Sequence, residues 1–245
     1  GRNNGFDSTV DLALLDGQNG FALAGGAALD FAGRDVSNAG DVNGDGFDDI
    51  IIGAHGADPN GSFSGASYVV FGKASGFASS ISLTSLDGLT GFKLSGVGAN
   101  HASGAAVSGA GDVNGDGFAD VIVGAYFAGA ADSRAGDSYL VFGKAGGFAP
   151  TIQLAALNGI DGVRIGGGTA MDYAGRSVSS AGDVNGDGID DLLIGAYGAD
   201  PNGALSGTSY LVFGRSTGFG SFLDVGLLDG TDGFTITGAG AGERS

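Results

Sequence analysis

A repeat of 71 residues constrains the fold of this chain more than any other feature of its sequence. The string AGDVNGDG begins at Ala39, Ala110 and Ala181, so 110 − 39 and 181 − 110 both equal 71. The strings YVVFG, YLVFG and YLVFG keep the same register and begin at Tyr68, Tyr139 and Tyr210. A fixed period predicts a repeat architecture, in which each copy buries its apolar surface against its neighbours.

Each repeat contains four short β patterns separated by turns rich in glycine or aspartate. In the first repeat these patterns cover residues 21–24, 35–39, 49–53 and 67–71. The third includes Ile50, Ile51 and Ile52, which is apolar on both faces of a strand and therefore typical of a sheet lying between two others. No segment has a convincing helical period. We therefore expect an all-β fold, with four-stranded antiparallel blades of a β-propeller.

The charge and composition of the chain exclude several classes of function. The 27 acidic and 10 basic residues give a formal net charge of −17, which repels phosphate backbones, so we expect no nucleic-acid partner. No apolar run approaches the roughly 20 residues of a membrane-spanning helix, so we expect no membrane insertion. The absence of cysteine excludes a disulfide framework and a thiol nucleophile, which leaves packing and a bound metal as sources of stability.

The DVNGDG loop carries oxygen-bearing side chains at its positions 1, 3, 5 and 9. In the first repeat these are Asp41, Asn43, Asp45 and Asp49, joined by the backbone carbonyl of Phe47 at position 7. The equivalent ligands are Asp112, Asn114, Asp116 and Asp120 with the carbonyl of Phe118, and then Asp183, Asn185, Asp187 and Asp191 with the carbonyl of Ile189. An all-oxygen set suits Ca²⁺ better than Mg²⁺. We therefore expect three Ca²⁺ sites, one in each repeat.

The three copies act as internal controls for the choice of ligands. Position 8 is Asp48 and Asp190 in two repeats but Ala119 in the other, whereas position 9 is always Asp, which favours position 9 as the ligand. Position 12 is apolar and lies in a β pattern, so the loop is not an EF-hand, which needs a carboxylate there. The alternative is that these residues only form a tight turn. Three converging carboxylates repel one another, however, which favours a bound cation.

The segment DVNGDGxxD followed by an apolar strand and Gly-Ala, as in residues 41–54, resembles the FG-GAP repeat. That repeat builds the propeller of integrin α-subunits and occurs in bacterial secreted and surface proteins. The chain departs from the family where Phe-Gly is replaced by Ala-Gly or Ser-Gly, at residues 32, 103 and 174. It also departs where the proline of Gly-Ala-Pro is replaced by His55, Tyr126 or Tyr197. Neither departure touches the calcium loop.

The resemblance implies how the repeats map onto blades. The calcium loop joins the innermost strand to the second one, and the first β pattern of each repeat completes the outer edge of the preceding blade. Residues 1–31 would then form a linker and an orphan outer strand, followed by blades at residues 32–102, 103–173 and 174–245. Three blades are part of a larger ring, which we expect to have seven. Further blades, or self-association of two chains, would complete it.

The resemblance also implies a non-catalytic, calcium-binding module for extracellular adhesion or recognition of a protein or glycan. The face opposite the metal would carry the recognition residues: Asp30, Phe31, His55, Asp58, His101, Tyr126, Phe127, Arg134, Asp172, Tyr173, Tyr197 and Asp200. Alternatively, the aromatic side chains plug the central channel or pack between blades. We expect no catalysis, because the two histidines occupy non-equivalent positions. The other functional hypothesis is an accessory propeller of a secreted hydrolase or polysaccharide lyase whose catalytic part lies outside this chain.

Overall fold

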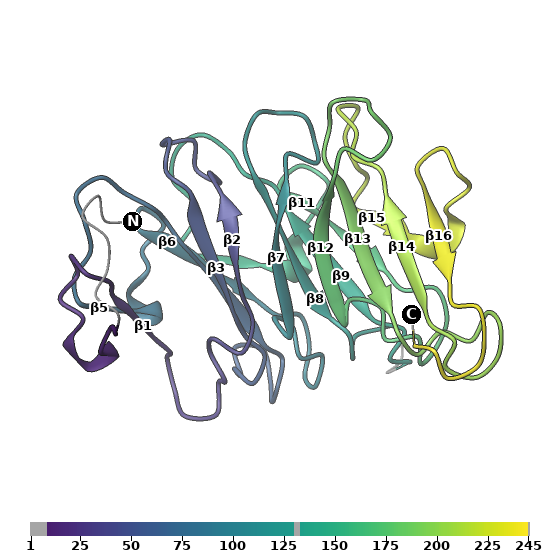
Figure 1. Cartoon of the computed structure of the whole chain (residues 1–245), viewed down its shortest axis with the longest axis horizontal. Helices are drawn as coiled ribbons and strands as arrows, with labels where there is room; N and C mark the ends of the chain where they lie inside the picture. Colours follow the sequence, from purple (N-terminus) through teal and green to yellow (C-terminus); the bar gives the residue numbers. More distant parts are fainter. Residues whose placement is uncertain (1–8, 130–132, 245) are drawn as a thin grey trace.

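The fold is all-β and consists of four sheets arranged in a row along the longest axis of the molecule (Figure 1). The structure is a computed structural model, and it describes residues 9–129 and 133–244. Within these residues, no helix is long and apolar enough to cross a membrane. The predicted fold class, a segment of a β-propeller, is confirmed.

Each sheet has its own order of hydrogen-bonded strands from one edge to the other. The first sheet contains β1 (Ala22–Ala24) and β5 (Ser80–Ser82). The second contains β10 (Thr151–Gln153), β6 (Gly91–Ser95), β4 (Ala66–Val70), β3 (Asp49–Ala54) and β2 (Val36–Gly40). The third contains β15 (Phe222–Asp224), β11 (Gly162–Gly166), β9 (Asp137–Val141), β8 (Asp120–Ala125) and β7 (Ala106–Gly111). The fourth contains β12 (Ser177–Gly182), β13 (Asp191–Ala196), β14 (Thr208–Val212) and β16 (Gly233–Thr237).

Each of the last three sheets has four antiparallel strands, and the outermost of these comes from the following repeat. In the second sheet, β2, β3, β4 and β6 pair antiparallel in that order. β1 belongs to no such sheet and pairs only with β5, as an orphan outer strand does. In this strand order, β6, β11 and β16 lie beyond β4, β9 and β14, on the side of each sheet away from β2, β7 and β12. Of the expected segment 1–31, residues 1–8 lie outside the described part.

A short parallel strand at the outer edge of the sheets is a feature that sequence reasoning missed. β5 pairs parallel with β1, β10 with β6, and β15 with β11. Each is three residues long and runs into a one-turn 3₁₀ helix: η2 (Leu83–Ser85), η4 (Leu154–Ala156) or η5 (Val225–Leu227). A further 3₁₀ turn, η1 (Leu12–Leu14), precedes β1. Each of these strands has three residues and at most one buried side chain, which is too short for an alternation of apolar and polar residues to be recognised in the sequence.

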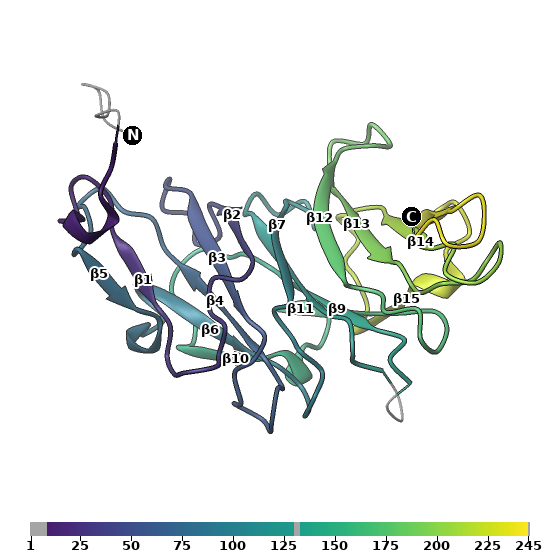
Figure 2. The ribbon, with the colours of Figure 1, turned by 60° about the horizontal axis from the view of Figure 1, so that its bottom comes forward.

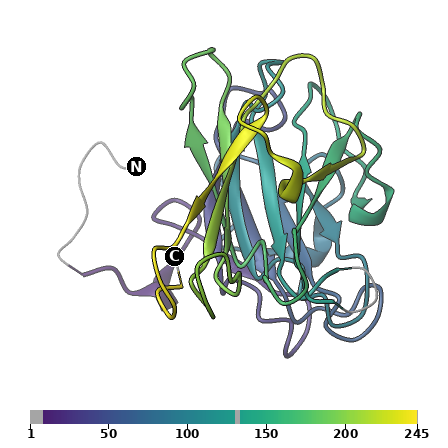
Figure 3. The ribbon, with the colours of Figure 1, turned by 90° about the vertical axis from the view of Figure 1, so that its right-hand side faces the viewer.

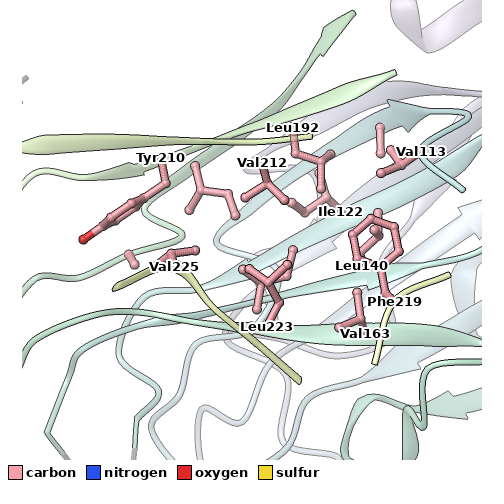
Figure 4. Close-up of a cluster of buried hydrophobic side chains, with 14 of the residues drawn as sticks. Val113, Ile122, Leu140, Val163, Leu192, Tyr210, Val212, Phe219, Leu223 and Val225 are labelled. Carbon is pink, nitrogen blue, oxygen red and sulfur yellow. The ribbon is translucent and has the colours of Figure 1, made fainter. Parts of the chain in front are cut away.

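The hydrophobic core lies between the sheets. Ile51 and Ile52 of β3 are both buried but point to opposite sides, Ile51 toward the third sheet and Ile52 toward the first. The expectation of a strand apolar on both faces is therefore confirmed. Figure 4 shows the equivalent cluster between the third and fourth sheets, where Ile122, Leu140 and Leu192 meet. Figure 2 shows the resulting fan of blades, with β2, β7 and β12 next to one another.

Glycine allows neighbouring blades to approach closely. Gly53 and Gly124 occupy equivalent positions near the ends of β3 and β8. A Cβ atom at either position would overlap the backbone carbonyl oxygen of Gly104 or Gly175 in the following blade. A larger residue would therefore push two blades apart.

The fourth sheet lies at the end of the row and faces the viewer in Figure 3. It leaves apolar side chains exposed there. Phe234 and Ile236 of β16 are 39% and 48% exposed, whereas the equivalent Val163 and Ile165 of β11 are 0% and 1% exposed. The difference arises because the fourth sheet packs over β11, whereas no sheet of the described residues packs over β16. The outer face of the last sheet thus has the apolar side chains that, in the third sheet, are buried by the next blade.

If the core between blades carries the stability, then truncating it should cost far more than truncating an exposed side chain. We predict that Ile122→Ala lowers the free energy of unfolding by about 2–5 kcal/mol, because it opens a cavity among fully buried neighbours. Ile160→Ala is the matched control, because Ile160 is 81% exposed, and it should change stability by about 0.5 kcal/mol or less. Urea denaturation followed by circular dichroism measures both; equal losses would contradict the prediction.

Candidate metal loops and the opposite face

The three DVNGDG loops join the innermost strand of each blade to the second, at one common end of the sheets. They connect β2 to β3, β7 to β8 and β12 to β13. The ladder shifts register just before each loop, between Asn38 and Gly40 in the first blade. Gly44 and Gly46 then have φ angles of 74° and 87°, a conformation that suits glycine. The same shift and the same two positive φ angles recur in the other loops.

The carboxylate at position 1 folds each loop around itself. Oδ1 of Asp41 accepts hydrogen bonds from the amides of Gly44 (2.8 Å) and Asp45 (3.0 Å), and Oδ2 accepts one from the amide of Gly46 (2.8 Å). Asp112 and Asp183 accept the bonds from positions 5 and 6 in the same way. The side chain at position 5 accepts from the amide of position 7 in each loop. This part of the loop is therefore an aspartate-stabilised turn.

The aspartate at position 9 is fully buried in every repeat. Asp49 accepts hydrogen bonds from the amides of Val42 (3.0 Å) and Gly72 (2.8 Å), which ties the loop to the end of β4. The pKa of Asp49 is raised to about 6, chiefly because the carboxylate is buried. The two hydrogen bonds lower this pKa, and the negative charges of Asp45 and Asp41 raise it. The pKa of Asp120 is raised to about 8 for the same reasons. A buried carboxylate beside two others favours a positive charge in the loop.

The residues of the loop fit Ca²⁺ in the chemistry of their donors. Asp41, Asp45 and Asp49 lie close enough for their charges to interact, and Asn43 adds an amide group. That amide donates from Nδ2 to Oδ2 of Asp45 (3.1 Å), so it must turn over before its oxygen can face a shared cation. Within the described residues, no three His, Cys, Asp or Glu side chains are already gathered as a metal cluster. The ligand assignments therefore remain predictions.

Neighbouring loops are hydrogen-bonded to one another. The carbonyl oxygen of Asp112 accepts from the amide of Asp190 (3.2 Å) in the following blade, and Oδ2 of Asp190 accepts from the amide of Asp112 (2.9 Å). Ala119 makes the same backbone bond to Asp41 (3.1 Å). Position 8 therefore contacts the preceding loop, a role that sequence reasoning missed. The contact varies between repeats because only Asp190 adds a carboxylate to it.

The opposite end of the sheets is built from two kinds of loop that hold each other. The β3–β4 loop accepts hydrogen bonds from the β6–β7 loop, as in Ala102 N to Phe63 O (3.0 Å). The β8–β9 and β11–β12 loops do the same, with Tyr173 N donating to Arg134 O (3.2 Å). Positive φ angles recur here in residues other than glycine: Leu29, Asn100 and Met171; Phe31, Ala102 and Tyr173; Phe63, Arg134 and Leu205. Such backbone costs roughly 1–3 kcal/mol per residue and persists only where its surroundings impose it.

The aromatic residues predicted on this face do gather there. Phe31 stacks on His55 with ring centroids 5.2 Å apart, and Tyr173 stacks on Tyr197 at 5.3 Å. Tyr173 also contacts Tyr126 at 6.5 Å and so links the second blade to the third. Packing between blades, the alternative kept open for these side chains, therefore accounts for part of their arrangement.

Arginine side chains cover part of the aromatic surface. The guanidinium of Arg176 lies 5.3 Å from the ring centroid of Tyr126, and that of Arg134 lies 5.5 Å from Phe127. Burial lowers the pKa of His55, and the charges of Arg34 and Arg176 lower it further. Three arginine side chains, Arg34, Arg134 and Arg176, therefore lie among the rings of this face.

The aspartates predicted on the same face serve their own loops. Asp30 accepts a hydrogen bond from the amide of Ala27 (2.9 Å), and Asp172 accepts one from Thr169 (2.8 Å). Asp58 and Asp200 accept from the amides of Phe63 and Leu205. These four carboxylates stabilise turns and do not need a ligand to explain them.

Four-stranded antiparallel sheets, stacked in series and built from one 71-residue repeat, define the chain as a segment of a β-propeller. The family model for the FG-GAP repeat matches residues 32–70, 103–141 and 174–212. The chain is therefore an FG-GAP repeat protein with an integrin-α-like propeller.

Two curated relatives are similar to this chain. It is 34% identical over 176 residues to integrin alpha pat-2 of Caenorhabditis elegans, a match that covers 68% of this chain and 13% of that protein. It is 35% identical over 166 residues to integrin alpha pat-2 of Caenorhabditis briggsae, which covers 64% of this chain and 12% of that protein. The chain thus corresponds to a small part of these relatives.

The contact between Asp190 and Asp112 allows a test of coupling between loops. We predict that Asp190→Ala lowers the free energy of unfolding by about 1 kcal/mol, because the amide of Asp112 loses its carboxylate partner. Asp48→Ala is the matched control: Asp48 occupies the same loop position but is exposed, so we expect a change of about 0.5 kcal/mol or less. Urea denaturation in the presence of a chelator measures both variants. Equal effects would show that the inter-loop bond contributes nothing.

Proposed function

We propose that this chain is a non-catalytic, Ca²⁺-binding β-propeller module that serves extracellular recognition or adhesion. The observation that carries the proposal is the threefold repetition of one loop with an amide and three carboxylates, of which the one at position 9 is buried. A tight turn needs one or two such residues. The remaining acidic groups raise the energy of the loop unless a cation neutralises them.

Calcium would act as a staple at one end of each blade. The predicted ligands of the first site are Asp41, Asn43, Asp45, Asp49 and the carbonyl oxygen of Phe47. Asp49 also accepts a hydrogen bond from the amide of Gly72, so an ion held by Asp49 would join the loop to the end of β4. Because an unfolded chain does not preform such a cage, the free energy of binding adds to the free energy of folding.

The hydrogen bonds between loops would extend this effect from one blade to the next. The carbonyl oxygen of Val42, beside the first site, accepts from the amide of Lys144 in the second blade (3.0 Å). Val113 and Arg215 make the equivalent bond (2.9 Å) between the second and third blades. Ordering one loop therefore restrains the loop beside it.

The recognition role rests on the similarity to integrin α chains, of which this chain matches only a small part. That similarity favours an extracellular, non-enzymatic adhesion module. The face opposite the calcium loops is the better recognition surface, because the loops there differ between repeats and carry exposed aromatic and arginine side chains. A protein or a glycan is the expected class of ligand.

Calcium binding is tested by the response of stability to the metal. We predict three sites in a calorimetric titration and a higher melting temperature in Ca²⁺ than in chelator, worth about 2.7 kcal/mol per site at 100 times the dissociation constant. Asp45→Ala should reduce the stoichiometry from three to two and lower the melting temperature in Ca²⁺. The loss in chelator should be smaller, because there the variant removes only the exposed hydrogen bonds that Asp45 accepts from Phe47 and Asn43.

The control is Asp48→Ala, which removes an equally exposed carboxylate from the same loop but not a predicted ligand. It should keep all three sites. No heat on titration, or a loss of stability by Asp45→Ala that is the same with and without Ca²⁺, would refute the staple.

The uncovered apolar face of the fourth sheet is the proposed site of association with another blade. In the isolated chain we expect a second copy to cover it, since equivalent side chains are fully buried by a neighbouring blade inside the molecule. Sedimentation velocity should show self-association that Ile236→Asp abolishes. Leu89→Asp is the control, because Leu89 is 77% exposed but lies outside the sheet face. A wild-type chain that remains monomeric at high concentration would contradict this expectation.

A further inference from the structure

A cavity of about 710 Å³ lies between the loops of the blades on the face opposite the calcium loops. Its lining includes His55 and Phe63 of the first blade and His101, Tyr126 and Arg134 from the loops of the second. This volume is within the range of about 300–1,000 Å³ that is typical of small-molecule sites. It is therefore large enough for a ligand of two or three sugar rings.

The cavity exists because the second repeat lacks a large side chain that the other two have. Phe31 and Tyr173 occupy equivalent positions, and each stacks on a ring of its own blade, His55 or Tyr197. The second repeat has Ala102 at this position, with a φ angle of 54° that matches 54° at Phe31 and 56° at Tyr173. The φ angle at this position is thus nearly the same in all three repeats. Only the ring is missing, and the space it would fill borders the cavity.

The second repeat also changes the charge around the same space. Asp30 and Asp172 are replaced at the equivalent position by His101, which lines the cavity. At another position, where the other repeats have Phe63 and Leu205, the second has Arg134. At these two positions, one carboxylate is therefore lost and one guanidinium gained.

Two further arginines lie beside the lining of the cavity. Arg34 Nη1 is 3.4 Å from Nε2 of His55, and the guanidinium of Arg176 lies over the ring of Tyr126 at 5.3 Å. No acidic side chain lines the cavity in the part of the chain that the structure describes. In a protein with a net charge of −17, this gathering of positive charge favours an anionic ligand.

The chemistry of the lining favours a carboxylate attached to a ring. The planar guanidinium of arginine binds a carboxylate through two parallel hydrogen bonds, whereas the ammonium group of lysine does not offer this paired geometry. The rings of Tyr126, Phe127 and Phe63 line the cavity, and Phe63, which is 44% exposed, offers flat apolar surface on which the C–H groups of a sugar ring pack well. Arg176 and Arg134 lie over the rings of Tyr126 and Phe127, so charge and aromatic surface adjoin each other in the cavity. Several backbone amides and carbonyls of the described loop residues are already paired with one another, as in Ala102 N to Phe63 O and Tyr173 N to Arg134 O, which disfavours the addition of a peptide strand there.

We propose that this cavity binds an acidic oligosaccharide, one whose sugar rings carry carboxylates, with Arg134 pairing with a carboxylate and the aromatic rings supporting the sugars. The inference rests on the proposed recognition function and names its class of ligand. Phe63 and Tyr126 come from neighbouring blades, so the site forms only where the two blades meet.

The test is a calorimetric titration of the whole chain, in calcium-containing buffer, with three probes: trigalacturonic acid, the neutral galactotriose and a triglutamate peptide. We expect binding of trigalacturonic acid that weakens as salt is raised, and much weaker binding of the other two. Absence of heat with trigalacturonic acid, equal affinity for galactotriose, or equal affinity for triglutamate would overturn the proposal.

Two variants place the binding in this cavity. Arg134→Gln should weaken binding on the order of tenfold or more, because it removes a charge-assisted pair. Ala102→Tyr restores the ring of the other repeats in a backbone conformation that already accepts it, and it should abolish binding at an unchanged melting temperature. If Ala102→Tyr fails to fold, Arg134→Gln alone decides the matter.

The charge-matched control is Arg215→Gln, which removes a guanidinium near the calcium loops and should leave the affinity unchanged. A loss equal to that of Arg134→Gln would show a nonspecific charge effect and overturn the assignment. If Ca²⁺ raises the melting temperature but trigalacturonic acid does not bind, the proposed oligosaccharide site is refuted and the proposed calcium module is not. A chain that shows neither response would refute both proposals.

Discussion

The stability of this chain depends on one constraint: each four-stranded blade carries apolar side chains on both faces and can bury them only against another sheet. Ile51 and Ile52 point to opposite sides of the same strand, and each is buried by a different neighbour. Glycine at Gly53 and Gly124 lets the backbones of successive blades approach closely. The row of sheets, and not the single blade, is therefore the stable unit, and the loops at both ends of the blades derive their positions from it.

Much of this fold could be predicted from the sequence, because a repeated pattern gives three independent readings of the same strand. The apolar run from Ile50 to Ile52 and the recurring YVVFG string mark β3 and β4 closely. The strands β5, β10 and β15 could not be found in this way, since each has three residues and is held by a parallel neighbour far away in sequence. Their signal lies in the tertiary structure.

The candidate sites show the same division. The spacing of Asp41, Asp45 and Asp49 was visible in the sequence, but the hydrogen bonds from Val42 and Gly72 to Asp49 were not, because Gly72 lies 23 residues away. The role of Asp190 was missed because its partner, Asp112, is in the preceding repeat. A signal for the cavity was present, however. Aligning the repeats with one another shows Ala102 and His101 where the other copies have an aromatic residue and an aspartate.

The two ends of the propeller segment therefore use repetition in opposite ways. At the end that carries the predicted calcium loops, DVNGDG is identical in all three copies. Each of these loops must form the same turn and the same contact with the loop beside it. At the other end, the backbone is equally repetitive, with positive φ angles at the same positions, but the side chains on it differ. A uniform backbone with varied side chains can change what it binds without changing how it folds. Specificity is then expected where the repeats differ most, at the junction of the first and second blades.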